Sequence, residues 1–356
     1  MIKIYQIKTL LIIFLLLIPF LAFAQHLYAP PSMSGVLNDN KMHIYLCGTG
    51  VPQESTQLLR KPACLAVIVD KKFLLFDAGA SSIQTLAGMG LPILQLHHVF
   101  LTHLHSDHMA GLGEVMNGTW HAGRTQPITI YGPYGIRSVL SGFKKAYRLD
   151  VIFRAIGGEG VLNPDLAFAH AKEISALEND VTVFTDKDLK ITAFPVDHLP
   201  VFPAFGYQIN YKSCKIVISG DTKVNESLAN HAKNADLLIN EAVSNPLYRA
   251  SVIIDSKNNP ALLQHAEQIF SYHSDSLLLA QMAKRENVKK LVLTHLLPSI
   301  PTTSDAKKSF IEGMNQYYQG PIMVADDRDE LIVDESGKNC QITYVPAKVL
   351  TLQKVT

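Results

Sequence analysis

Residues 102–108 constrain the fold of this chain more than any other stretch. They read Thr-His-Leu-His-Ser-Asp-His and directly follow an apolar run that predicts a buried strand. Residues two apart on an extended backbone project to the same side, so His103 and His105 are expected to point together. Asp107 and His108 lie where the strand ends and a helix is expected to begin. The spacing can bring three imidazoles and a carboxylate into one small volume, which suits zinc and similar divalent ions.

Three later segments repeat this arrangement, because each places polar side chains directly after an apolar run. The candidate metal ligands in them are His198, Asp221 and His295. Polar residues at strand ends are what a site on one rim of a sheet requires. Taken singly, the two histidines could be buried and hydrogen-bonded, and the aspartate could belong to an ordinary turn. The complete set favours a metal site over these alternatives and over a histidine-rich polar loop.

The pattern HxHxDH, followed in order by His, Asp and His, resembles the metallo-β-lactamase superfamily, and most closely its ribonuclease Z and arylsulfatase-type branch. Further segments carry the likeness, namely 46–52, 76–79, 238–242 and 272–274. The resemblance implies the α/β fold of that superfamily, an αββα sandwich of two facing mixed sheets with outer helices. The site would lie along one edge between the sheets.

The resemblance also implies two divalent metal ions, zinc first, with manganese or iron as alternatives. Seven residues would supply the ligands: His103, His105 and His198 for the first ion, Asp107, His108 and His295 for the second, and Asp221 as the bridge. Such a pair supplies hydroxide at neutral pH, because the pKa of zinc-bound water is near 7. Asp77 is expected to orient the ligands, with a turn-capping aspartate as the alternative.

Glu241 and His273 are expected, again by resemblance, to form a catalytic dyad. A histidine that is oriented by a carboxylate can give a proton to the leaving oxygen of an ester. The sequence alone does not bring the two side chains together, and His273 could instead cap the helix that follows it. Asp107 is counted among the catalytic residues as well as among the ligands.

The predicted activity is that of an exported hydrolase that uses a metal-bridging hydroxide on a small phosphodiester or sulfate ester. The alternatives are a lactone or β-lactam hydrolase and, less favoured, a ribonuclease Z-like endonuclease. A non-catalytic binding protein with this fold would be marked by lost ligands, and none is lost. Only residues 199–220 separate His198 from Asp221, which leaves no room for the tRNA-gripping arm that is typical of this interval in bacterial and archaeal ribonuclease Z.

The net charge of +1 gives no strong nucleic-acid footprint. We therefore expect a small-molecule ester as the partner and no nucleic acid, and leave a homodimer open.

The N-terminus has the three-part pattern of a secretory signal peptide. Two lysines precede an apolar run at 10–23, and Ala-Phe-Ala at 22–24 fits a cleavage site before Gln25. The run is shorter than the about 20 residues of a membrane-spanning helix, so cleavage is favoured over a stable anchor. A periplasmic or secreted protein is expected, with a signal peptide at 1–24, a flexible leader at 25–40 and a metallo-β-lactamase-like hydrolase domain at 41–345.

Four cysteines, at positions 47, 64, 214 and 340, leave disulfides and free thiols equally open. An exported protein could oxidise them in any of three pairings, of which Cys47 with Cys64 is conceivable because both lie on early strands. Buried thiols on apolar strands are the alternative.

Apolar periodicity and turn residues predict one domain of mixed elements, with no clear pattern at 150–185. Strands are expected at 43–47, 65–69, 73–76, 98–102, 128–131, 190–196, 206–211, 215–219, 236–240, 290–294 and 330–333. Helices are expected at 109–120, 134–147, 226–233, 260–271, 275–287 and 304–318.

Overall fold

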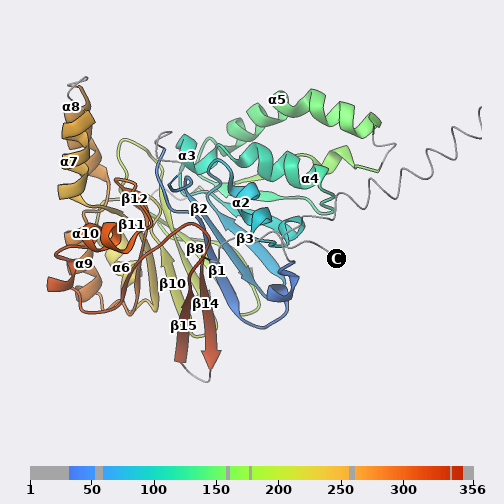
Figure 1. The fold of residues 1–356 in the computed structure, drawn as a ribbon. Coiled ribbons are helices and arrows are strands. Elements are labelled where there is room, and N and C mark those ends of the chain that lie inside the picture. Colours follow the sequence, from blue (N-terminus) through green and yellow to red (C-terminus); the bar gives the residue numbers. More distant parts are fainter. Residues whose placement is uncertain are drawn as a thin grey trace, which may run out of the picture.

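Two β-sheets pack face to face, and helices cover the outer side of each (Figure 1). The computed structural model describes residues 32–52, 59–157, 161–175, 179–255, 261–336 and 339–347. Within these residues the architecture is the expected α/β sandwich of mixed sheets with outer helices. The signal peptide predicted at 1–24 lies outside the described part of the chain.

The first sheet has the strand order β15-β14-β1-β2-β3-β4-β5-β6 among the described residues. Its strands are β1 (Met42–Gly48), β2 (Cys64–Val69), β3 (Lys72–Phe76), β4 (Leu96–Phe100), β5 (Thr129–Gly132), β6 (His170–Glu173), β14 (Asp329–Ser336) and β15 (Asn339–Val345). Asp70 and Lys71 connect β2 to β3, and both have positive φ. A two-residue turn of this kind matches the twist of a hairpin, so β2 and β3 are antiparallel. From β3 onward the neighbouring strands run parallel.

The second sheet has the order β13-β12-β11-β10-β9-β8-β7 in the same described ranges. Its strands are β7 (Val181–Asp186), β8 (Leu189–Pro195), β9 (Phe205–Tyr211), β10 (Cys214–Ile218), β11 (Leu237–Val243), β12 (Leu291–Leu297) and β13 (Ile322–Val324). Strands β10 to β13 are parallel and mostly apolar, as expected for strands that are covered on both faces, with polar residues near the ends of β11 and β12.

Helices of the first half cover the first sheet, and helices of the second half cover the second (Figure 1). The first group includes η1 (Ser34–Leu37), α2 (Ser82–Gly88), η3 (Ile93–Gln95), α3 (Ser106–Met109), η4 (Glu114–Gly118), α4 (Thr119–His121), α5 (Ile136–Gly157) and η5 (Pro164–Leu166). The second includes α6 (Glu226–Ala232), α7 (Asn245–Asp255), α8 (Ala261–Tyr272), α9 (Ser276–Arg285), α10 (Ser304–Phe310) and η7 (Met314–Gln316). One apolar cluster fills the space between the sheets, and two others lie under the outer helices.

Several helices differ from the expectation. The helix expected at 109–120 is divided into α3, a π-helical turn (η4) and α4. After α3, the N–H of Gly111 donates to the carbonyl of Ala78 at 2.8 Å and not to an intrahelical carbonyl, and a Cβ at Gly111 would lie 2.3 Å from the carbonyl oxygen of Gly79. The helix expected at 304–318 ends at Phe310, and α7 (Asn245–Asp255) lies where no helix was predicted.

Helix α5 runs ten residues beyond the expected end at 147. Four apolar side chains of this extension are exposed instead of facing the sheet, namely Leu149, Ile152, Phe153 and Ile156. This exposure hides the usual amphipathic pattern and explains why the extension was not predicted. No helix in the described ranges is long and apolar enough to cross a membrane.

The cysteines form two disulfides, Cys47–Cys64 and Cys214–Cys340, which settles a question that the sequence leaves open. The second disulfide joins β10 of one sheet to β15 of the other. In the predicted leader, the described part contains η1, and Val36 and Leu37 pack against the outer side of the first sheet.

Candidate metal centre

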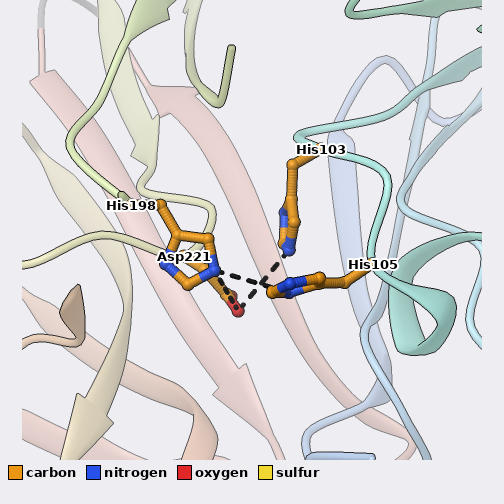
Figure 2. Close-up of side chains that lie close together, drawn as sticks. All are labelled: His103, His105, His198 and Asp221. Atoms are coloured by element: carbon orange, nitrogen blue, oxygen red, sulfur yellow. Dashed lines mark hydrogen bonds and ion pairs between the residues drawn. The ribbon is translucent and has the colours of Figure 1, made fainter. Parts of the chain in front are cut away.

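The HxHxDH segment passes from the end of β4 into α3 and delivers its polar side chains to the rim between the sheets. His103 is fully buried, and its Nδ1 lies 3.0 Å from Oγ1 of Thr102. Asp107 and His108 are buried in the single turn of α3. Figure 2 shows the His103 and His105 rings facing His198 and Asp221. The structure therefore brings the first motif and the later candidate residues together.

Asp77 fixes the orientation of this segment from the end of β3. Its Oδ1 accepts a hydrogen bond from the backbone N–H of Thr102 at 2.8 Å, and its Oδ2 accepts one from His108 Nδ1 at 2.8 Å. The Nε2 atom of His108 is thereby turned toward the other candidate ligands. A carboxylate that holds the far nitrogen of a ligating histidine is the usual arrangement in metal sites.

The second sheet supplies the other half of the cluster. His198 follows β8 and donates from Nδ1 to the carbonyl of Tyr272 at 3.2 Å. Asp221 follows β10 directly after Gly220, which has a φ of 61°. A Cβ at Gly220 would lie 2.5 Å from the carbonyl oxygen of Phe205, so only glycine fits this turn. His295 lies within β12 and is 5% exposed.

Oδ2 of Asp221 lies at the centre of the cluster. Its distances to histidine Nε2 atoms are 3.3 Å for His108, 3.4 Å for His295, 3.8 Å for His198 and 3.9 Å for His103. His103, His105, His198 and Asp221 form one group whose ligand atoms all lie within 4.8 Å of one another, and Asp107, His108 and His295 form a second. The seven predicted ligands thus divide into the two predicted groups, although His273 also falls in a third group with Asp221 and His295.

The electrostatics of the two groups differ. Burial lowers the pKa of His103 and His105, and lowers that of His198 to about 4, so these imidazoles are neutral at pH 7. Burial also acts to lower the pKa of His295, but Asp221 and Asp107 outweigh it and raise the value to about 9.

The same carboxylates raise the pKa of His108 well above its ordinary value against the effect of burial. Asp107 and Asp221 therefore favour positive charge in the second group. A divalent cation bound there would compensate these carboxylates as a protonated histidine does.

The donor set fits a divalent metal. Nε2 of His103 and Nε2 of His108 are buried and have no hydrogen-bond partner among the described residues. Such atoms are rare in folded proteins unless they bind an ion or water. Imidazole and carboxylate donors together suit zinc, manganese or iron.

Glu241 and His273 are brought into direct contact. His273 Nδ1 donates to Glu241 Oε1 at 2.8 Å, and the N–H of Thr222 donates to the same oxygen at 2.9 Å. Burial and the nearby charge of Asp221 raise the pKa of Glu241, and burial lowers the pKa of His273 to about 4. The contact that the sequence could not establish is present, while the catalytic role of the pair stays a prediction.

A cavity of about 290 Å³ opens onto the cluster beside His273 and His295. Its apolar wall comes from separate parts of the chain, namely Val51, Tyr248, Ile269, Tyr272 and Leu297. Val51 and Tyr272 lie in the motif segments 46–52 and 272–274, whereas Tyr248, Ile269 and Leu297 carry no motif. The sequence therefore indicated only part of this wall.

A family model described as anti-Pycsar protein Apyc1 matches residues 42–252, which is more than half of the chain. The chain belongs to this family. The chain, like this family, belongs to the metallo-β-lactamase superfamily, as the resemblance in the sequence implied. Ribonuclease Z from Mycobacterium bovis (strain BCG / Pasteur 1173P2) is 30% identical over 263 residues, which cover 73% of this chain and 87% of that protein. Ribonuclease Z from Mycolicibacterium gilvum is 29% identical over 262 residues, with 73% and 85% covered.

Solved structures agree on the fold. The metallo-β-lactamase fold protein YhfI from Bacillus subtilis has a TM-score of 0.58 at 19% identity, over 82% of this chain and 99% of that one. The short form of human tRNase Z has a TM-score of 0.56 at 23% identity, over 81% and 98%.

These relatives contradict the expectation that no nucleic acid is a partner, because proteins named ribonuclease Z act on RNA. The error came from reading a net charge as if it described every surface. Helix α5 exposes five basic side chains, namely Arg137, Lys144, Lys145, Arg148 and Arg154, despite the near-neutral total. Local positive charge can bind phosphates whatever the sum over the chain.

Proposed function

We propose that the protein is an exported hydrolase that cleaves phosphodiesters with two divalent ions, preferentially zinc. The observation that carries the proposal is the position of Asp221 Oδ2, which lies 3.3–3.9 Å from four imidazole nitrogens drawn from both ligand groups. One carboxylate oxygen in this position can serve two ions. The ribonuclease Z relatives favour a phosphodiester over a lactone, a β-lactam or a sulfate ester.

Each ion would have three protein ligands besides the shared Asp221. The first would be held by His103, His105 and His198, and the second by Asp107, His108 and His295. Two such ions, when bound, supply a nucleophile from water at neutral pH and stabilise charge on the phosphoryl oxygens. Asp77 and the carbonyl of Tyr272 hold the far nitrogens of His108 and His198, so that both rings keep their ligating atoms toward the centre.

His273 is proposed to pass a proton to the leaving oxygen. Because burial lowers the pKa of His273 to about 4, its Nε2 carries no proton at pH 7 and would first take up the proton that the attacking water loses. Its Nδ1 is committed to Glu241, which leaves Nε2 as the ring atom that can reach the reacting ester. Glu241 acts as a positioning residue, since its Oε1 accepts from both His273 and Thr222. The cavity beside His273 gives room for the departing alcohol. Asp107 is proposed to contribute to catalysis through its place beside both His108 and His295.

The test is a substrate panel on zinc- or manganese-loaded protein: bis(p-nitrophenyl) phosphate, p-nitrophenyl sulfate, a chromogenic cephalosporin and an aryl lactone. We expect kcat/KM to be highest on the phosphodiester. The Asp221→Ala variant should be inactive, whereas the matched surface control Asp305→Asn should match wild type, because Asp305 is 96% exposed. A higher kcat/KM on the sulfate, the cephalosporin or the lactone would refute the proposed substrate class.

The proposal of export is supported by the two disulfides, since such bonds persist in oxidising compartments. Expression with the native N-terminus, followed by mass spectrometry of the periplasmic and secreted fractions, should find Gln25 as the first residue. Recovery of chains that begin at Met1 would contradict cleavage.

A further inference from the structure

His295 has a backbone that a histidine rarely adopts. Its φ is 44°, in the left-handed region. The pairing of β12 with β11 shows why. Glu241 pairs with Thr294, and the next residue of β11, Ala242, pairs with Leu296, so His295 is the extra residue of a β-bulge. A bulge of this kind changes the direction of one side chain, and here it turns His295 toward Asp107 and Asp221.

A strained residue keeps its conformation only where its surroundings hold it. On one side β12 is held by β11. On the other side, its register with β13 covers Leu291–Leu293, which ends before the bulge. Directly after the bulge, the N–H of Leu296 donates to the carbonyl of Thr49 at 3.0 Å. Thr49 follows β1, so a residue of the first sheet holds the bulge of the second.

Thr49 is itself held by two charged side chains. Asp327 Oδ1 accepts from the Thr49 N–H at 2.8 Å and from its Oγ1 at 2.7 Å, while Oδ2 accepts from the N–H of Lys61 at 2.6 Å. Arg60 Nη1 donates to Thr49 Oγ1 at 2.7 Å. The Thr49 hydroxyl thus accepts from the arginine and donates to the aspartate.

Arg60 is only 1% exposed and connects Thr49 to two segments of the chain, one after β12 and one before β14. Its Nε donates to the carbonyl of Ile300, in the loop after β12, at 2.9 Å. Its Nη2 pairs with Asp326 Oδ1 at 2.8 Å, in the segment before β14. A guanidinium can hold three directions at once because of its rigid fork of donors, which a lysine lacks.

We propose that Arg60, Thr49 and Asp327 are positioning residues for His295, and hence determine the affinity of the ion held by Asp107, His108 and His295. None of the three lies among the candidate ligands. The inference rests on the proposed function, in which His295 is a ligand. The inference goes beyond the proposed function because it assigns control of the affinity for one ion to Arg60, Thr49 and Asp327, which are not ligands.

The test compares Thr49→Val, which removes the hydroxyl at nearly constant volume, with Thr49→Ser, which keeps it. Metal-free protein is titrated with zinc by calorimetry, and bound metal is counted by elemental analysis. In Thr49→Val we expect the dissociation constant of the second ion to rise about tenfold or more, a usual cost of losing a group that orients a ligand. Thr49→Ser should restore it, and the first ion should keep its affinity in both variants.

Two backgrounds separate positioning from general loss of structure. In a His295→Ala background, Thr49→Val should cause no further loss of metal affinity, whereas in a His105→Ala background the effect on the second ion should persist. Asp334→Asn, which removes the charge of a carboxylate at the far end of the same β1–β14 pair, is the matched control and should change neither constant. Equal weakening of both ions by Thr49→Val, or an unchanged second constant, would overturn the positioning role. Retention of both ions by His295→Ala would instead show that the ligand assignment itself is wrong.

Discussion

The Cys214–Cys340 disulfide should contribute more to stability than any single side chain outside the metal centre. It joins cysteines 126 positions apart and connects β10 of the second sheet to β15 of the first. The perturbation is the double variant Cys214→Ala with Cys340→Ala, which leaves no free thiol. Cys47→Ala with Cys64→Ala, whose cysteines are 17 positions apart, is the matched comparison.

The difference between the two follows from loop entropy. A crosslink restricts the unfolded chain, and its effect grows with the logarithm of the loop length. For the long loop the model gives about 4.9 kcal/mol at 25 °C, and for the short loop about 3.1 kcal/mol. The free energy of unfolding should therefore fall by about 2 kcal/mol more in the first variant than in the second.

The assay is urea unfolding, followed both by far-ultraviolet circular dichroism and by the fluorescence of Trp120, the one tryptophan of the chain. Coincident transitions would justify a two-state treatment. The reasoning fails if the short-loop variant loses as much free energy as the long-loop variant, or more. Such a result would mean that local contacts at each bridge, and not loop length, determine its contribution.

Three further outcomes are expected. Asp221→Ala should abolish turnover and reduce the bound metal measured by elemental analysis, because its Oδ2 faces both ligand groups; two tightly bound ions in this variant would refute the bridge. The His273→Ala variant should keep its metal but lose about 10²-fold more of its hydrolysis rate on alkyl phosphodiesters than on nitrophenyl ones, because good leaving groups need no proton. Equal losses of rate on both substrates would refute the acid role.

Burial lowers the pKa of His43, but hydrogen bonds to Glu330 and Asp39 outweigh it and raise the value above 6.5. Its stabilising effect is therefore present below pH 6.5 and is lost as pH rises through the folded pKa, so His43→Gln should reduce the urea midpoint more at pH 6 than at pH 9.

The sequence predicts the centre well because its ligands follow apolar strands, and strand ends converge on a rim. The seven residues could be assigned as ligands because their order along the chain resembles that of the superfamily. The contact between His273 and Glu241 could only be expected by resemblance, since 31 residues and two helices separate them. The inner strands were predicted because their runs are short, apolar and bounded by turns. The edge strands β6, β7, β13 and β15 were not predicted.

What the sequence did not predict depends on contacts between distant segments. Arg60 has no motif around it, and its burial depends on Thr49, Ile300 and Asp326 arriving from three places. Asp327 lies in the polar run at 326–328 before β14, and nothing in that run indicates a contact with Thr49. The bulge at His295 arises from pairing with β11, which apolar periodicity does not encode. The predicted helix ends before α5 does, because the apolar residues in the last part of α5 face solvent.

The division of the ligands between the two sheets links metal binding to folding. His103, His105, Asp107 and His108 come with the first sheet, and His198, Asp221 and His295 come with the second. Neither sheet alone can complete either group, so ions bind tightly only after the sheets have docked. By mass action, an ion at a hundred times its dissociation constant then stabilises the docked state by about 2.7 kcal/mol. A chain exported unfolded would therefore gain this stability only where metal is available, and metal starvation would lower the free energy of unfolding of the docked state.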